Sequence, residues 1–112
     1  MITFKGIQDK ITEFVRERNW EQYHSPKNLA MSVAIESGEL MEIFQWLTVE
    51  ESWNVKNDPQ KKEHVGEEIS DVILYCLRMA QVMEIDIEEA LLDKIEKNKK
   101  KYPKEKFYGN YE

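Results

Sequence analysis

Apolar residues recur every three or four positions along four stretches of this chain, and no stretch alternates strictly between apolar and polar as a half-buried strand does. In the first stretch, residues 4–18, the apolar positions are Phe4, Ile7, Ile11, Phe14 and Val15. This spacing places them on one face of a helix. The pattern therefore predicts an all-α protein of the four-helix-bundle type.

Two further helices are predicted by their start signals. A serine-proline pair at 25–26 and an aspartate-proline pair at 58–59 both combine a good N-cap residue with a proline in the first helical turn. The apolar periodicity that follows each pair extends to about residue 47 and about residue 83. We therefore expect helices over residues 26–47 and 59–83, joined by a loop over 48–58.

The fourth helix is predicted to start after Asp86, with Glu89 three residues later as a capping box. Its periodic pattern continues to about Lys101. Pro103 cannot continue a helix, and it opens the polar C-terminal tail of residues 103–112.

The length of 112 residues is that of one domain, which we expect to span residues 1–112. The single cysteine, Cys76, has no partner for an internal disulfide and lies in an apolar run, so we expect it in the core. The N-terminus has no apolar signal segment, and no run approaches the roughly 20 apolar residues of a membrane span. These features predict a cytoplasmic protein without a membrane partner.

The chain has 22 acidic and 16 basic residues, for a net charge of −6, which argues against a nucleic-acid partner because such binding needs a basic surface. The basic residues concentrate in 94–106, whereas the middle of the chain is acidic. A cation site in the acidic part and phosphate contacts in the basic part would fit this asymmetry. For most individual lysines, a solvated helix end is an equally good interpretation.

An acidic residue interrupts the apolar face of the second predicted helix. At about 100° per residue, Glu36 falls in the middle of that face, and Glu39 falls at its edge. The apolar residues around Glu36 on the projection are Leu29, Val33, Leu40, Ile43 and Leu47. An ionised group in such a place is costly unless it is paired or bound to a metal.

The third predicted helix repeats this arrangement. Glu68 falls in the middle of its apolar face, between Val72 and Tyr75, and Asp71 falls at the edge, as Glu39 does. The neighbouring Glu67 projects well to the side, so geometry favours Glu68 as the inward residue. Each of two long helices therefore carries an acidic pair spaced i, i+3.

Four such carboxylates need a cation if they converge. Groups spaced i, i+3 lie about 5–6 Å apart, where two charges repel by about 3 kcal/mol at a dielectric near 20. Oxygen ligands suit Mg²⁺, with Mn²⁺ as a possible substitute, rather than Zn²⁺. A di-iron bundle needs a Glu-x-x-His pair on each of two core helices, which this chain does not have. The alternative is that these acids face solvent.

The two acidic pairs, at 36–39 and 68–71, resemble the ExxE…ExxD metal motif of the MazG-like nucleoside triphosphate pyrophosphohydrolases. The surrounding sequence is similar to the dCTP pyrophosphatase branch of that family, and the similarity covers roughly residues 4–103. The segments that carry it are residues 20–29, 44–46, 67–75 and 94–103.

The resemblance implies an enzyme that hydrolyses a deoxynucleoside triphosphate, dCTP or a modified dCTP, to the monophosphate and pyrophosphate. It implies catalytic Mg²⁺ ligands at Glu36, Glu39, Glu68 and Asp71, and a homo-oligomer, a dimer or tetramer. It further implies a role in clearing the nucleotide pool. The substrate-binding residues that it implies are Trp20, His24, Asn28, Trp46, Tyr75, Lys94, Asn98 and Lys101. The chain departs from the pattern of the branch at Ile11, where the resemblance implies a histidine near the base.

Other interpretations of these residues stay open. Trp20 and Trp46 suit base stacking and core or interface packing about equally, and Tyr75 suits a phosphate contact or the core. Trp53, in the predicted loop, suits a lid or a subunit contact. The enzyme could also act on other or many bases, and a helical oligomerisation domain without activity is the alternative from a different class.

Overall fold

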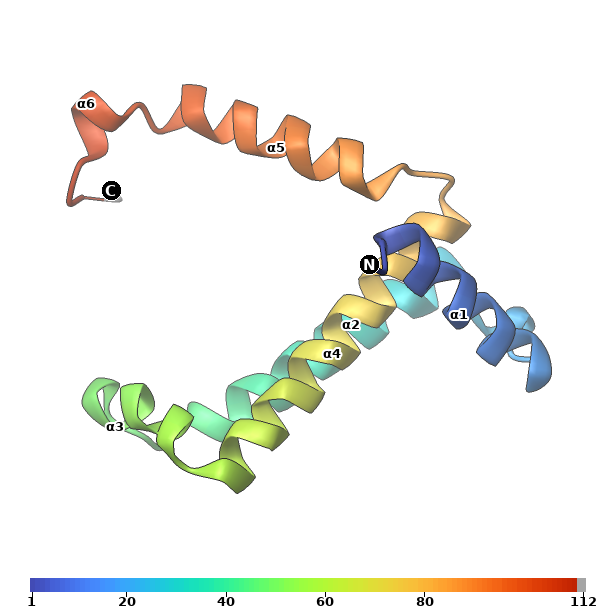
Figure 1. Cartoon of the computed structure of the whole chain (residues 1–112), viewed down its shortest axis with the longest axis horizontal. Helices are drawn as coiled ribbons and strands as arrows, with labels where there is room; N and C mark the ends of the chain where they lie inside the picture. Colours follow the sequence, from blue (N-terminus) through green and yellow to red (C-terminus); the bar gives the residue numbers. More distant parts are fainter. Residues whose placement is uncertain (111–112) are drawn as a thin grey trace.

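The computed structural model describes residues 1–110, and within them every regular element is a helix (Figure 1). The all-α class predicted from the sequence is confirmed. No helix in the described residues combines the length and the apolar content that a membrane span requires. The elements are α1 (Phe4–Glu17), η1 (Glu21–Tyr23), α2 (Pro26–Phe44), α3 (Val49–Trp53), η2 (Asn54–Asn57), α4 (Pro59–Val82), α5 (Ile87–Lys101) and α6 (Lys104–Phe107).

The two longest helices, α2 and α4, lie antiparallel and pack along most of their length (Figure 1). Their starts are as predicted, because a side chain caps each one. The Ser25 hydroxyl accepts a hydrogen bond from the backbone N–H of Asn28 (3.1 Å), and a carboxylate oxygen of Asp58 accepts one from that of Lys61 (3.2 Å). Leu29 of α2 is only 1% exposed and belongs to the core.

Helix α1 crosses the end of this pair and packs mainly on α4 (Figure 1). Val15 is buried in the contact. The buried amide of Gln8 donates a hydrogen bond to the backbone oxygen of Leu77 (2.9 Å), and so replaces the water that both groups lose on folding. This polar contact fixes where α1 lies along α4.

The connection over residues 48–58 is largely helical, so the loop predicted there is wrong. It contains α3 and η2. The physical reason is a capping box: Thr48 accepts from the N–H of Glu51 (3.0 Å), and the Glu51 carboxylate accepts from the N–H of Thr48 (2.8 Å). Val55, within η2, is buried.

Helix α5 starts at the Asp86 cap, as predicted, and then runs away from the α2–α4 pair (Figure 1). Every residue from 91 to 101 is exposed. The radius of gyration is 17.2 Å, against about 13 Å for a compact chain of this length. The tail contains the short helix α6, which the sequence did not predict, and the part of the tail after residue 110 lies outside the described residues.

The predicted burial of Cys76 is wrong for the single chain, where its side chain is exposed. Cys76 follows Ile69 and Ile73 at helical spacing on α4, and these two residues are also exposed. An apolar stripe of α4 is therefore left exposed by the described residues of this chain.

Candidate active site

Three carboxylates meet where α2 and α4 face each other. Oxygen atoms of Glu36, Glu39 and Glu68 all lie within 4.8 Å of one another. Glu36 and Glu39 are one turn apart on α2, and the packing of the two helices brings Glu68 on α4 opposite them. A cluster of this kind could hold a metal ion.

The cluster is short of compensating positive charge. Glu68 is 8% exposed, and one oxygen each of Glu36 and Glu68 is buried without a hydrogen-bond partner within residues 1–110. Burial, the hydrogen bond shared with Glu39 and the negative charges around it raise the pKa of Glu36 from 4.5 to about 7. His64 Nε2 lies 3.3 Å from Glu68 Oε1 but stands mostly in solvent.

Asp71 lies one turn beyond Glu68 on α4, at the edge of the cluster. Its charge contributes to the raised pKa of Glu36, and its side chain lines the adjoining cavity. Glu67 is exposed, whereas Glu68 is buried, which agrees with the choice made from the helical projection.

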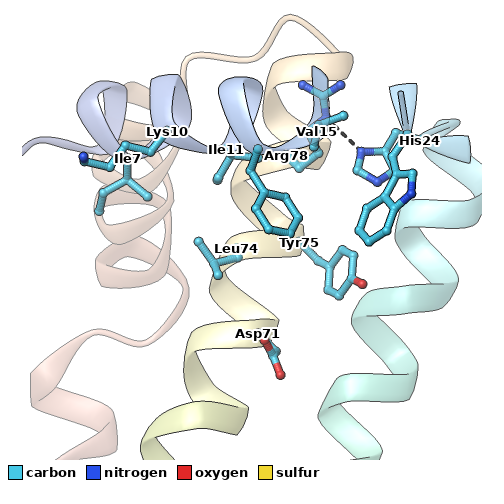
Figure 2. Close-up of a pocket in the computed structure, with 11 residues that line it drawn as sticks. Ile7, Lys10, Ile11, Val15, His24, Asp71, Leu74, Tyr75 and Arg78 are labelled. Carbon is cyan, nitrogen blue, oxygen red and sulfur yellow. Dashed lines mark hydrogen bonds between the residues drawn. The ribbon is translucent and has the colours of Figure 1, made fainter. Parts of the chain in front are cut away.

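A cavity of about 470 Å³ opens beside the carboxylates (Figure 2). Its walls come from α1, from the segment before α2 and from α4, with Asp71 near one end and Arg78 two turns further along α4. The lining is mainly apolar and aromatic, which is typical of sites that bind small organic molecules. The residues that line it are Ile7, Lys10, Ile11, Phe14, Val15, Trp20, His24, Asp71, Leu74, Tyr75 and Arg78.

Trp20, His24 and Tyr75, all predicted as substrate contacts, lie in this cavity. The Trp20 ring meets the Phe14 ring edge-on, with centroids 5.7 Å apart. Ile11 lies in the wall between α1 and α4, at the position where the resemblance implied a histidine. The cavity therefore joins an aromatic wall to the acidic cluster.

His24 is hydrogen-bonded to Arg78, a residue that was not predicted from the sequence. Its Nδ1 atom accepts a hydrogen bond from Nε of Arg78 (3.0 Å). Burial, and then the Arg78 charge, lower the pKa of His24. A signal for Arg78 existed, because a residue seven positions after Asp71 lies on the same side of a helix.

Asn28 is occupied by local structure. Its side-chain amide donates a hydrogen bond to the backbone oxygen of Tyr23 (3.0 Å), which holds the turn before α2. The predicted contact between Asn28 and substrate stays a prediction.

Two tryptophans lie far from this cavity. Trp46 is 87% exposed just after the C-terminal end of α2, whereas the cavity adjoins the N-terminal end of that helix. Trp53 lines a smaller hollow of about 240 Å³ with Phe44 and Lys62. A contact between Trp46 and a substrate in the cavity would therefore need a second copy of the chain.

The predicted stripe of Lys94, Asn98 and Lys101 lies on α5, and all three side chains are exposed. Because α5 runs away from α2 and α4, a single chain does not bring this stripe to the carboxylates (Figure 1). The Lys101 ammonium instead lies 5.3 Å from the centre of the Tyr102 ring.

Comparisons with known proteins agree with this architecture. The model of the MazG-like family matches residues 31–111, and the chain belongs to that family. A crystal structure of a pyrophosphatase from Archaeoglobus fulgidus superimposes with a TM-score of 0.84 and is 43% identical, over 92% of this chain and 94% of that one. The chain is also similar to dCTP pyrophosphatase 1 of Bos taurus (37% identical) and of Homo sapiens (38%), over 90% of its own length. It spans about 60% of the length of these curated relatives.

Proposed function

We propose that this chain hydrolyses a deoxynucleoside triphosphate to the monophosphate and pyrophosphate, with dCTP or a modified dCTP as the preferred substrate. The observation that carries the proposal is the continuity of the acidic cluster with an aromatic cavity. One end suits a cation and the phosphates, and the other suits a base.

The residues fit a divalent cation. All four acids offer hard oxygen ligands, and the unpartnered oxygens of Glu36 and Glu68 are the groups that a cation would satisfy. We propose Mg²⁺, with Mn²⁺ as a substitute, held by Glu36, Glu39, Glu68 and Asp71. When bound, it supplies the positive charge that attracts a triphosphate and makes a water molecule more acidic.

Two further roles in the hydrolysis are assigned to side chains of the chain itself. Glu39, the exposed member of the cluster, orients a water molecule and takes its proton. The water oxygen bonds to the α-phosphorus, the bond to the bridging oxygen breaks, and pyrophosphate leaves. Tyr75, one turn after Asp71 on the cavity wall, donates a hydrogen bond from its hydroxyl to a phosphate oxygen.

The base is held in the cavity against Trp20. Base–aromatic stacking contributes about 1–3 kcal/mol and is tolerant of base identity. The preference for cytosine is supported by the relatives named dCTP pyrophosphatase 1, which are 36–38% identical to this chain. The fit with such relatives also supports a role in clearing the nucleotide pool.

A second copy of the chain completes the enzyme, as a dimer or tetramer. Leu91, Leu92 and Ile95 on α5 are all exposed in the single chain, as are Ile69 and Ile73 on α4. Exposed apolar residues at helical spacing on two elements are typical of a subunit interface. Lys94, Asn98 and Lys101 lie beside the α5 stripe, so an interface there would carry them toward a partner's phosphate site. The cytoplasmic location stays a prediction.

The test is a panel of deoxynucleoside triphosphates incubated with the chain and Mg²⁺. We expect release of pyrophosphate rather than orthophosphate, and a higher kcat/KM for dCTP than for the purines. Release of orthophosphate from every substrate would contradict the reaction class. A purine triphosphate that turns over fastest would contradict the substrate alone.

A further inference from the structure

Arg78 stands in the cavity wall with its guanidinium held from two sides. Its Nε donates to His24 Nδ1 (3.0 Å), and its Nη1 donates to Gln81 Oε1 (3.2 Å). The Gln81 amide is held in turn, because it donates to the backbone oxygen of Gln8 (3.2 Å) and to the Thr12 hydroxyl (2.9 Å). Residues of α1, of α4 and of the turn before α2 therefore fix the position of one arginine.

The hydrogen bond with Arg78 also fixes the tautomer of His24. An arginine nitrogen can only donate, so His24 Nδ1 must accept, and the imidazole is neutral with its proton on Nε2. The lowered pKa of His24 agrees with a neutral ring. His24 and Arg78 thus offer the cavity hydrogen-bond donors and no acceptor.

The arginine lies at a suitable distance from the acidic cluster. Arg78 follows Asp71 by seven residues, which is about 10.5 Å along a helix and comparable with the length of a nucleoside. Phe14 and Trp20 line the same cavity as Asp71 and Arg78, and their rings meet edge-on. A nucleotide with its phosphates near Asp71 and its base against these rings would turn an edge of the base toward Arg78.

We propose that Arg78, positioned by His24, is the specificity-determining residue that reads the base edge, and that it selects the adjacent O2 and N3 acceptors of cytosine. Uracil and thymine carry a hydrogen on N3, which would oppose a donor of the arginine. Two neighbouring acceptors suit a guanidinium, which donates in a planar fork. The Nη2 group has no hydrogen-bond partner within the described residues, and Nη1 uses only one of its two hydrogens, so these two groups are available as the fork. This inference rests on the proposed function.

The experiment removes one acceptor from the substrate and one donor from the protein. We would measure kcat/KM for dCTP, 3-deaza-dCTP (which has a C–H in place of N3) and dUTP, with the wild type, Arg78→Ala and Arg78→Lys. Arg16→Ala is the matched control, because Arg16 is an exposed arginine on α1 that does not line the cavity.

For the wild type and Arg16→Ala, we expect kcat/KM for dCTP to exceed that for 3-deaza-dCTP and dUTP by about tenfold or more, the usual effect of a hydrogen bond to a charged group. For Arg78→Ala, the kcat/KM values of the three substrates should agree within about twofold. Arg78→Lys should retain part of the preference, because lysine keeps the charge but lacks the fork.

If Arg78→Ala lowered kcat/KM by the same factor for all three substrates, the inference would be overturned and Arg78 would have a purely structural role. A preference for dGTP that depends on Arg78 would overturn the choice of cytosine. Binding of dCMP and 3-deaza-dCMP, measured by calorimetry, makes the same comparison without turnover. An absence of hydrolysis together with a preference that depends on Arg78 would therefore reject the proposed reaction and keep the inference.

Discussion

Helices α4 and α5 follow each other in the chain, yet they relate to the rest of the molecule in opposite ways. Helix α4 buries Leu77 and Ala80 in the core and also buries the carboxylate Glu68. Helix α5 has no buried residue, although it contains large apolar side chains. Leu92 is 65% exposed and Ile95 is 51% exposed.

The difference shows how each helix acquires its environment. The surroundings of α4 come from α1 and α2 of the same chain, so its Glu68 carboxylate already lies in a cluster with Glu36 and Glu39. Those of α5 are expected to come from outside the chain, because Leu91, Leu92 and Ile95 on this helix are exposed among the described residues. Substitutions in α4 should therefore reduce catalytic turnover directly. Substitutions in α5 should first disrupt the association of the subunits.

The largest effect is expected on α4. Glu68→Gln keeps the size of the side chain but removes a charge that a cation needs, so kcat should fall on the order of a thousandfold. Glu67→Gln is the matched control, because Glu67 is exposed on the same helix, and it should retain activity. Pyrophosphate release checks turnover, and circular dichroism should show equal helix content. Full activity in Glu68→Gln would remove this residue from the site.

A smaller and indirect effect is expected on α5. Ile95→Glu places a charge in the apolar stripe and should shift the protein toward monomers in sedimentation at micromolar concentration. Activity should fall about tenfold or more, and should recover in part at high protein concentration. Lys100→Glu, on the far side of the helix, should leave both properties near the wild type. An active wild-type monomer would contradict the assembly.

The smallest effect concerns the stability of the metal-free protein. The pKa of Glu36 is about 7 in the fold and about 4.5 when unfolded, so the folded state holds its proton more tightly. This group therefore lowers the free energy of unfolding as pH rises from about 4.5 to 7, and the loss is complete above that range. Glu36→Gln removes the loss.

Thermal unfolding in a chelator checks this prediction. At pH 8, Glu36→Gln should melt a few degrees above the wild type, whereas near pH 4.5 the two should agree. Mg²⁺ should raise the Tm of the wild type more than that of the variant. A variant that is less stable than the wild type at pH 8 would show that the carboxylates do not repel each other in the fold.

Local signals predicted the helices well. The caps at Ser25, Asp58 and Asp86 each give a start that the structure shares. The projection identified Glu36 and Glu68 because a charge within an apolar face is visible in the sequence. Helix α3 was missed because its capping box, Thr48 with Glu51, supports only five residues and leaves no periodic pattern.

Contacts between distant residues were beyond the sequence. The bond between Arg78 and His24 joins positions 54 residues apart, and it depends on where α1 lies along α4. A helical projection gives the direction of a side chain around its axis but no distance along a neighbouring helix. For this reason it could not separate Trp20, which lines the cavity, from Trp46, which does not.

The continuity of α4 has a consequence for the size of molecule that the cavity admits. Glu68, Asp71, Tyr75 and Arg78 all belong to one uninterrupted helix of 24 residues. Their spacing is set by backbone hydrogen bonds rather than by a loop, so it cannot stretch to follow a longer or shorter ligand. One inserted residue after Asp71 would turn Arg78 by about 100° and shift it by about 1.5 Å. Helix α4 thus sets a fixed distance between the acidic and the aromatic ends of the cavity.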